Sequence, residues 1–540
     1  MKKDILTYIN WPQSYGATSL KSDILAGLTV ALVLIPQSMA YAELAGLPAY
    51  YGLYASFLPP LIAALFGSSR QLATGPVAVV SLLTATALEP LATGGSQQFI
   101  AYAVLLALLV GVFQFCLGVL KLGLVVNFIS HPVVNGFSNA AALIIATSQL
   151  PRLFGIHIDK TPHHYELIYG VFKTAATYVH WPTLLMGALA FAIMYGLKRV
   201  SPRLPNVLVA VLITTIVSWS IGFENNMMVD INAIHSDQIQ QTIKNFNNSL
   251  ESITALAEER ARLTQRLNAG DDSGDPLAEL VTKHTAERIT LQIEQLKTRT
   301  RNQRRQLRLS LLEGKTSSDG SLSFSPIDEM TDRSGVDGRT WRLKIGNTPL
   351  ALDRLQLIGG GEVVGNIPRG LPSFSLPRID YHIILHLLPF VAIISLLGFM
   401  EAISVAKAMS AKTGQRLDPN RELIGQGLAN ICGAVAKSYP VSGSFSRSAV
   451  NLQSGAISGL SSVFTSLTVV VVLLFFTPLF YHLPQSVLAA IIMMAVVGLI
   501  NVRGFIHAWQ AQWYDGAISI ITFIGTLAFA PHLDRGILIG

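Results

Sequence analysis

The fold is decided by two short segments, Thr74-Gly-Pro-Val-Ala-Val-Val-Ser81 and Ser442-Gly-Ser-Phe-Ser-Arg-Ser-Ala-Val-Asn451. Each begins with a hydroxyl residue and a glycine, a pattern that suits an N-cap followed by a position where a ligand can approach the backbone. Pro76 also suits an early helical position, and Glu89-Pro90 ends the first segment. Both segments therefore predict short helices that interrupt a membrane-spanning path.

The two segments occupy corresponding places in the two halves of the chain, each after apolar helices. An interrupted helix is tolerated in a bilayer only where its free backbone groups face protein or a watery cavity. Paired broken helices in matching positions predict a transport site between inverted repeats. Two facing helix N-termini favour an anion, because they offer free N–H groups and positive dipole ends. The alternative is that both segments are tight packing motifs.

Apolar runs surround these segments along the chain. A membrane-spanning helix needs about 20 mostly apolar residues. Runs of roughly that size cover 23–45, 50–66, 99–120, 132–150, 182–198, 205–222, 383–408, 456–481, 484–501 and 515–531, and shorter ones cover 75–89, 421–436 and 442–453. Their number excludes a soluble fold and predicts an all-α polytopic membrane protein.

Charge is distributed unevenly. Charged residues make up 13% of the chain, whereas soluble domains carry about 25%. The stretch from Asp230 to Arg369 holds 19 acidic and 19 basic residues, so the whole formal net charge of +7 belongs to the apolar remainder. This pattern indicates basic loops at an anionic membrane surface and no nucleic-acid binding.

The basic residues of the short loops predict the topology. With the N-terminus inside, the cytoplasmic side receives Lys21, Arg70, Lys121, Lys198, Arg199, Arg203, Lys412, Arg416, Arg421 and Arg503. Fewer remain outside, namely Arg152, Lys160, Lys173, Arg378, Lys437 and Arg535. Because positive charge gathers on the cytoplasmic side, we expect an inner (plasma) membrane protein with a cytoplasmic N-terminus.

The charged stretch is expected to form an insert, residues 225–370, on the outer face. It would separate a first transmembrane part, 1–224, from a second, 371–540. Apolar residues recur at helical spacing from Leu250 to Leu267 and again from Leu277 to Leu312, which predicts a helical hairpin. Residues 340–365 could add a short strand pair. The triplet at Gly314 resembles the end of a phosphate loop but lacks its first glycine, so we expect no nucleotide site.

Polar residues inside apolar helices are the candidates for chemistry. Arg447 lies one turn into the second half-helix, and a charge at membrane depth is costly and usually functional. Glu401 lies inside a long apolar helix, where a carboxylate could carry a proton or pair with Arg447. Gln37 and Tyr41 are one turn apart and could line a cavity together. Glu43 and Glu89 are near helix ends, where we expect exposure.

The sequence resembles the SulP family, the sulfate permeases and related anion exchangers. The resemblance rests on both half-helix segments and on Asp23-Ile-Leu-Ala-Gly-Leu-Thr-Val30, Ile35-Pro-Gln-Ser-Met-Ala-Tyr-Ala42, Tyr51-Gly-Leu-Tyr-Ala-Ser-Phe57 and Pro419-Asn-Arg-Glu-Leu423. It covers nearly all of the chain outside the insert. It implies two inverted repeats of seven transmembrane segments, which form a core and a gate domain, an elevator-like motion and a homodimer.

The resemblance also implies a site between the N-termini of the third and tenth helices. Carried over to this sequence, its substrate-binding residues are Gln37, Tyr41, Thr74, Gly75, Val77, Ser444, Phe445, Ser446 and Arg447, and Glu401 is the coupling candidate. Members of the family usually end in a cytoplasmic STAS domain, which this sequence lacks, and an apolar segment stops at Gly540. We therefore expect a fragment or a chain without its last helix. The insert is also longer than the usual connection.

The expected function is secondary active uptake of sulfate, coupled to protons through Glu401. Sodium- or proton-coupled transport of bicarbonate or a dicarboxylate, or anion exchange, is the alternative within the family. For sodium-coupled transport we would expect an Asp at position 401 and a hydroxyl residue one helical turn later. This sequence has Glu401 and, one turn later, Val405. A non-transporting sensor that uses the insert is an alternative of a different class. The sequence predicts no enzyme, cofactor or metal site.

Overall fold

The computed structural model divides into two compact units. It describes residues 15–92, 94–123, 131–158, 163–201, 205–269, 276–316, 322–327, 336–346, 348–377, 379, 381–530 and 533–539. The larger unit, here called the membrane unit, comprises the chain up to Ile156, Thr161–Ile221 and the chain from Glu362 onward. The smaller one, the insert, contains Gly222–Gly361.

The boundary after the insert lies earlier than the sequence predicted. Gln485 N donates to Glu362 O, and Val364 N donates to Leu483 O, each at 2.9 Å. These hydrogen bonds attach the chain to the membrane unit directly after Gly361. Residues 362–370, which we assigned to the insert, therefore belong to the membrane unit.

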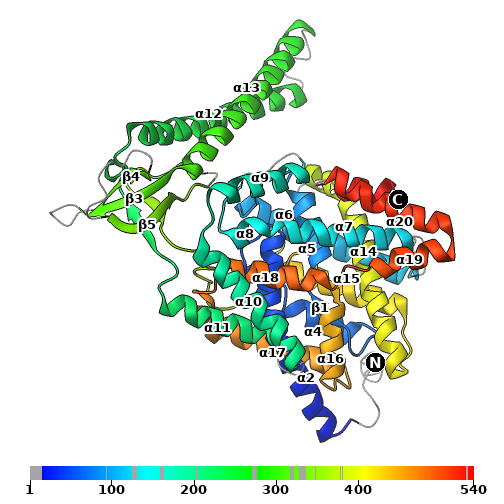
Figure 1. Ribbon diagram of the computed structural model, residues 1–540. Helices are drawn as coiled ribbons and strands as arrows, with labels where there is room; N and C mark the ends of the chain where they lie inside the picture. The colour runs from blue at the N-terminus through cyan, green and yellow to red at the C-terminus, as the bar shows by residue number, and fades with distance from the viewer. Residues whose placement is uncertain are drawn as a thin grey trace. The chain divides into compact units, whose positions relative to one another are not determined.

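The first half of the membrane unit is helical apart from one short strand (Figure 1). Its elements are α2 (Ala17–Leu44), α3 (Tyr50–Tyr54), α4 (Leu58–Phe66), β1 (Ala73–Gly75), α5 (Ala78–Leu88), α6 (Gln97–Val119), α7 (His131–Ser148), α8 (Leu150–Phe154), α9 (His164–Thr177), α10 (Trp181–Val200) and α11 (Asn206–Ser220). The predicted run 50–66 is divided into α3 and α4, because Pro59 and Pro60 suit the start of a new helix.

The second half repeats this order. It contains α14 (Tyr381–Thr413), α15 (Pro419–Val435), β7 (Ser442–Ser444), α16 (Phe445–Gln453), α17 (Leu460–Val471) with a π-helical turn at Val472–Phe476 and a 3₁₀ turn at Thr477–Phe480, α18 (Gln485–Val497), α19 (Val502–Ala511), α20 (Trp513–Phe529) and α21 (Leu533–Ile539). Among the described residues, seven helices are long and apolar enough to cross a membrane, and four further apolar helices are shorter. The predicted polytopic helical fold is confirmed.

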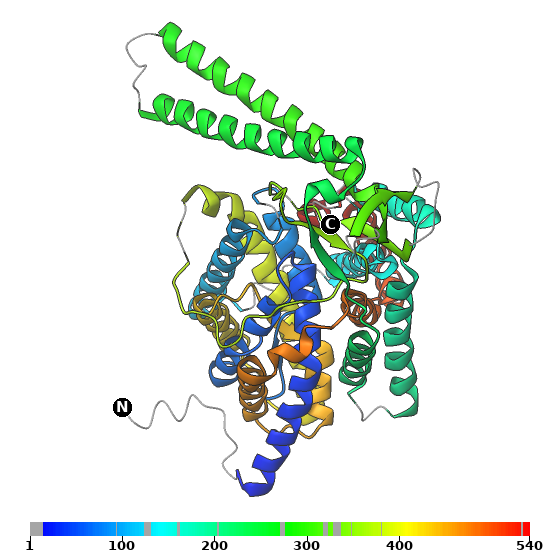
Figure 2. The same ribbon diagram turned by 90° about the vertical axis from the view of Figure 1, so that its left-hand side faces the viewer.

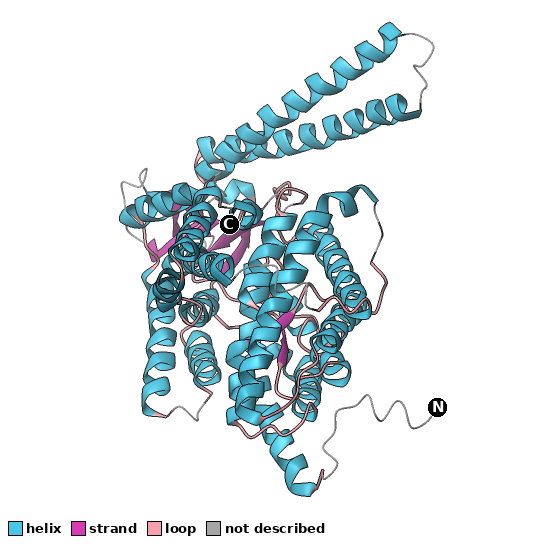
Figure 3. Cartoon of the chain, turned by 90° about the vertical axis from the view of Figure 1, so that its right-hand side faces the viewer, coloured by secondary structure: helices cyan, strands magenta, loops and turns pink. Residues whose placement is uncertain are grey.

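The two halves exchange contacts in a reciprocal way. α6 of the first half packs against α14 and α15 of the second half, while α17 of the second half packs against α2 and α4 of the first. The strands β1 and β7 pair with each other at the centre (Figure 3). This reciprocity is what an inverted repeat predicts.

The helices of the membrane unit form two groups. The core group contains α2 to α6 and α14 to α17, whose strongest contacts are with one another. The gate group contains α7 to α11 and α18 to α21, with close pairs such as α7–α20 and α10–α18. Both half-helices, α5 and α16, belong to the core group, so the residues of the site are carried by one group of helices.

The insert combines a helical hairpin with a sheet (Figure 2). α12 (Asp237–Ala269) and α13 (Pro276–Leu309) form the hairpin, and β2 (Asn226–Val229), β3 (Leu311–Thr316), β4 (Leu322–Pro326), β5 (Val336–Leu343) and β6 (Leu355–Ile358) form an antiparallel sheet in the order β2-β6-β5-β3-β4. The short strand pair expected in residues 340–365 is present where β5 pairs with β6, and three further strands extend it into the sheet. Phe324 and Trp341 contact each other in the core beneath the sheet.

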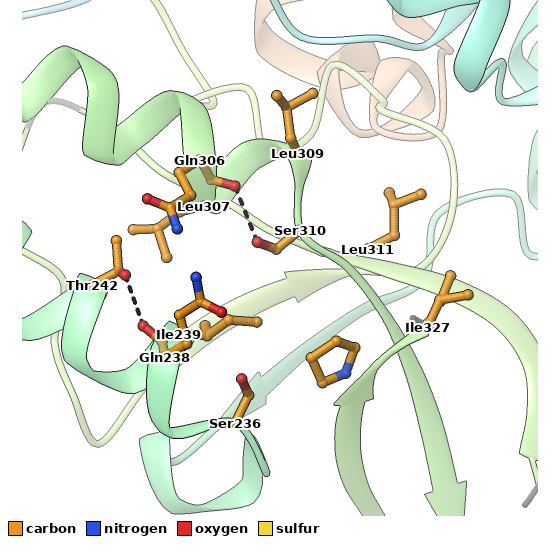
Figure 4. A pocket seen from close by; sticks show the side chains of 11 residues that line it. Ser236, Gln238, Ile239, Thr242, Gln306, Leu307, Leu309, Ser310, Leu311 and Ile327 are labelled. Carbon is orange, nitrogen blue, oxygen red and sulfur yellow. Dashed lines mark hydrogen bonds between the residues drawn. The ribbon is translucent and has the colours of Figure 1, made fainter. Parts of the chain in front are cut away.

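A pocket of about 350 Å³ lies in the insert, between the first turn of α12 and the last turn of α13 (Figure 4). Its lining includes Ser236, Gln238, Gln306 and Ser310, together with aliphatic residues, and none of its lining residues is charged. The triplet at Gly314 lies in β3, paired with β4. The pocket therefore lacks a charged group to attract an anion, and the membrane unit holds the stronger candidate.

Candidate functional site

Two buried antiparallel strands cross at the centre of the core group. Thr74 of β1 lies opposite Gly443 of β7, and Gly75 lies opposite Ser442. α5 begins at Ala78 and α16 begins directly after β7, so both half-helices start from this strand pair. The first N–H groups of a helix have no partner within that helix. The two positive helix ends therefore start at opposite ends of one three-residue strand pair.

The hydroxyl residues do not cap the half-helices, contrary to our expectation. The N-cap positions belong to Val77 and Ser444, and neither helix has a side-chain cap. Thr74 instead accepts a hydrogen bond from α15, and Ser442 donates one to α14. Pro76 also lies before the helix and not at an early helical position. The strand pairing extends the backbone through these residues, which moves each helix start further along the chain.

Arg447 is fully buried beside this strand pair. Its Nη1 atom donates to Gln37 Oε1 at 3.2 Å, and Gln37 Nε2 donates to Tyr41 OH at 2.9 Å. The remaining donors, Nε and Nη2, are buried without an acceptor among the described residues. Since an uncompensated buried charge is costly, the guanidinium is prepared to receive an anion. The structure thus joins three of the predicted site residues.

Gly75 lies against the guanidinium. A Cβ atom at Gly75 would come within 3.3 Å of Arg447 Nη2 and 3.4 Å of Leu34 Cδ1. The glycine therefore leaves room beside the free donors. Val77, two residues later, is buried at the start of α5. Of these two positions, Gly75 is the one next to the charged group.

The start of α16 is more open than Arg447. Phe445 is 57% exposed and Ser446 is also exposed, whereas Ser444 is buried. The hydroxyls of Ser444 and Ser446 lie 3.4 Å apart. This helix start therefore connects the buried guanidinium with the accessible surface of the membrane unit.

Glu401 of α14 is half-buried near the same charge. It interacts electrostatically with Arg447 and Tyr41, but no hydrogen bond or ion pair of its carboxylate is recorded among the described residues. The alternative that Glu401 is the direct structural partner of Arg447 therefore has no ion pair to support it.

The sequence prediction missed a row of polar residues on α15. Glu422, Gln426 and Asn430 are spaced four residues apart, and all three are buried. Gln426 contacts Thr74 of β1, and Asn430 bonds to the backbone of Val441 before β7. The signal for this row was the recurrence of a polar residue at every fourth position within the apolar segment 421–436.

Glu43 also differs from the expectation. Its side chain is 8% exposed, and its Oε2 atom accepts a hydrogen bond from Arg152 Nη1 at 2.7 Å. We expected an exposed residue at a helix end, and this expectation was wrong. The partner that buries Glu43 comes from α8 of the gate group.

The comparison with known families accounts for this architecture. The model of the Sulfate permease family matches residues 20–264 and 349–522. The chain belongs to the sulfate permease family. Members of this family are membrane transporters, so the chain is a multi-pass membrane protein of a transporter family and not an enzyme. Residues 265–348, which include most of the insert, fall outside the matched ranges.

Individual relatives agree with this family assignment. The chain is 32% identical to the chloroplastic sulfate transporter 4.1 of Arabidopsis thaliana, over 98% of this chain and 58% of the relative. It is 29% identical to the sodium-independent sulfate anion transporter of Bos taurus, over 96% of this chain and 68% of the relative. The chain thus spans less than two thirds of the length of the plant protein.

Solved structures share the fold of the family. The murine Solute Carrier 26 family member A9 anion transporter, in the inward-facing state, matches with a TM-score of 0.68 at 18% identity, over 99% of this chain and 69% of that one. The transmembrane domain of a cyanobacterial bicarbonate transporter, BicA, matches with a TM-score of 0.62 at 17% identity, over 97% and 98%. At these identities the likeness establishes the fold alone.

Proposed function

We propose that this protein takes up sulfate across the bacterial inner membrane together with protons. The observation that supports the proposal most is Arg447, which is fully buried and has two unpartnered donors at the meeting point of two half-helices. A tetrahedral oxyanion can accept hydrogen bonds from Nε and Nη2 at once, as carboxylates and phosphates do with arginine. The plant and bovine relatives are both named as sulfate transporters.

The coupling proposal rests on the relation between Glu401 and Arg447. The two groups interact electrostatically across the site. A negative charge on Glu401 opposes a dianion, whereas a neutral Glu401 leaves the charge of Arg447 available. Proton binding and sulfate binding would then favour each other, and linkage makes this effect reciprocal. Each sulfate would therefore enter with a proton on Glu401.

The proposed motion follows from where the site residues lie. Gln37, Gly75, Glu401 and Arg447 all belong to helices or strands of the core group. A displacement of the core group against the gate group would carry the complete site from one side to the other. An elevator-like mechanism needs this arrangement, since the substrate moves with the residues that hold it.

The proposed orientation keeps the N-terminus in the cytoplasm and the insert outside. It is supported by the basic loop residues between the helices, most of which lie on the cytoplasmic side in this orientation. The uncharged pocket of the insert gives no reason to assign the transport site there.

The proposal can be tested by sulfate uptake into proteoliposomes, with and without an inward proton gradient. We expect gradient-dependent uptake in the wild type, and uptake without proton dependence in Glu401→Gln. Glu166→Gln, on α9 of the gate group, is the matched control and should behave as the wild type. Accumulation of bicarbonate or a dicarboxylate in place of sulfate would contradict the substrate. Absence of transport for every anion would favour the sensor.

A further inference from the structure

A buried carboxylate holds the chain that leads into β1. Glu422, in the first turn of α15, is 1% exposed. Its Oε2 atom accepts hydrogen bonds from Ser68 N at 2.9 Å, Ser69 N at 3.0 Å and Ser68 Oγ at 3.0 Å. All three donors are neutral groups of one turn. The charge of Glu422 therefore strengthens its hold on this turn, because hydrogen bonds to an ionised acceptor are shorter and stronger.

The same face of α15 also holds the middle of β1. Gln426 Nε2 donates to Thr74 Oγ1 at 2.8 Å and lies 3.3 Å from Glu422 Oε1, to which it also donates. The segment from Ser68 to Thr74 is thus fixed at both ends by two side chains that lie one turn apart and bond to each other. α15 therefore holds this segment at its two ends, while Ser448 and Asn451 of α16 bond to the backbone of Ala73 and Gln71 between them.

This segment ends beside the free donors of Arg447. Gly75 follows Thr74 directly, and its missing Cβ leaves the space next to Arg447 Nη2. Val77 is then the N-cap of α5. A shift of β1 therefore moves both the first N–H groups of α5 and the space beside the guanidinium. Binding geometry at such a site is sensitive to displacements of about 1 Å.

We propose that Glu422 is a positioning residue of the anion site. Its carboxylate sets the distance between the N-terminus of α5 and Arg447 through the turn at Ser68 and through Gln426. The inference rests on the proposed function, because it concerns affinity for the transported anion. It predicts that replacing Glu422 lowers the affinity for the anion, whereas replacing a residue that is needed only for folding does not.

Asp23 provides a matched control in the same group of helices. It is fully buried, and its carboxylate accepts from Ile457 N at 2.7 Å, Ser458 N at 3.2 Å, Ser458 Oγ at 2.5 Å and Tyr15 OH at 2.6 Å. Like Glu422, it binds two successive backbone N–H groups and a serine hydroxyl. The turn that it holds follows α16, ten residues after Arg447, and does not lead into β1.

The experiment compares Glu422→Gln with Asp23→Asn in proteoliposomes that contain the full chain. We expect Glu422→Gln to raise the KM for sulfate about tenfold with kcat within about twofold, the size expected for a misplaced binding group. Asp23→Asn should lower the apparent Tm about as much as Glu422→Gln does, because each removes a buried carboxylate charge that accepts several hydrogen bonds. It should nevertheless leave the KM for sulfate within about twofold of the wild-type value. Glu422→Asp, which keeps the charge, should recover part of the affinity.

Gln426→Leu tests the same contacts between α15 and the segment from Ser68 to Thr74 without removing a charge. It keeps the inference testable if Glu422→Gln does not fold. It should also raise KM, and its effect should not add to that of Glu422→Gln because both act on one segment. Equal KM changes in Glu422→Gln and Asp23→Asn, or an unchanged KM in both α15 variants, would overturn the inference. A wild type that moves no anion would instead contradict the proposed function.

Discussion

A Cβ atom on Gly75 would lie 3.3 Å from Nη2 of Arg447, so the absence of a side chain at one residue keeps space beside a charge on another. The two residues are 372 positions apart and belong to different halves of the chain. Gly75 also has a φ of +151°, a conformation that residues with a side chain rarely adopt. Its position therefore requires glycine for backbone geometry and for space.

Gly75→Ala should weaken substrate binding more than it weakens the fold. The added methyl group would press on the guanidinium and occupy space beside its free donors, so we expect KM for sulfate to rise by about tenfold or more. Gly95→Ala is the control, because Gly95 also has a positive φ but nothing within 4 Å of its Cβ position. An equal loss of affinity in both variants would mean that backbone strain alone is responsible.

Arg447→Lys separates the charge of this residue from its planar group. Lysine keeps a positive charge but cannot offer two parallel donors or reproduce the bond from Nη1 to Gln37 Oε1. We expect kcat/KM to fall by about 10- to 100-fold, the value of one or two hydrogen bonds to a charged group. Arg447→Gln should remove uptake. Wild-type kinetics in the lysine variant would show that charge suffices.

The sequence indicated which segments carry the candidate site. Glycine and hydroxyl residues that interrupt apolar segments marked both half-helices, and a charge among apolar residues marked Arg447. Gln37 was visible because it breaks an apolar helix face. These signals are local, since each depends on residues within one or two helical turns, and such patterns can be read from a single chain.

The details that depend on distant partners could not be predicted. Thr74 looked like an N-cap, but pairing with Gly443 draws it into a strand. Glu43 looked exposed, but Arg152 covers it from another group of helices. Strand β2 of the insert escaped prediction for the same reason, because it pairs with β6 across the whole hairpin.

His164 should make the N-terminal end of α9 sensitive to acid. Burial lowers the pKa of His164 below its ordinary value of 6.5, and its Nε2 atom lies 2.6 Å from Thr147 Oγ1 of α7. The folded protein favours the neutral ring, so the unfolded chain binds the proton more readily and stability falls as pH drops through about 6.5. The apparent Tm between pH 7.5 and 5.5 should fall less in His164→Asn than in the wild type.

His163→Asn is the control for this titration, since the neighbouring ring is exposed and stacks on Tyr165. It should keep the wild-type pH dependence. If both variants kept the full loss of stability on acidification, another group would have to be responsible for it.

The pair of Glu43 and Arg152 should couple the core group to the gate group. Glu43 is in α2 and Arg152 in α8, so their contact joins helices that an elevator-like motion would separate. Arg152→Gln leaves a buried carboxylate without its partner and should lower the apparent Tm. Adding Glu43→Gln removes the unpaired charge, so the double variant should be more stable than Arg152→Gln alone.

Transport kinetics of the double variant then test what the contact does in the cycle. The hydrogen bond of Arg447 goes to Gln37 and not to this pair. KM should therefore stay within about twofold while kcat changes, because only the balance between two positions of the core group is altered. If the double variant lost as much stability as Arg152→Gln and Glu43→Gln lose together, the two residues would not interact. A changed KM with constant kcat would show that the pair acts on the anion site and not on the motion between the two groups.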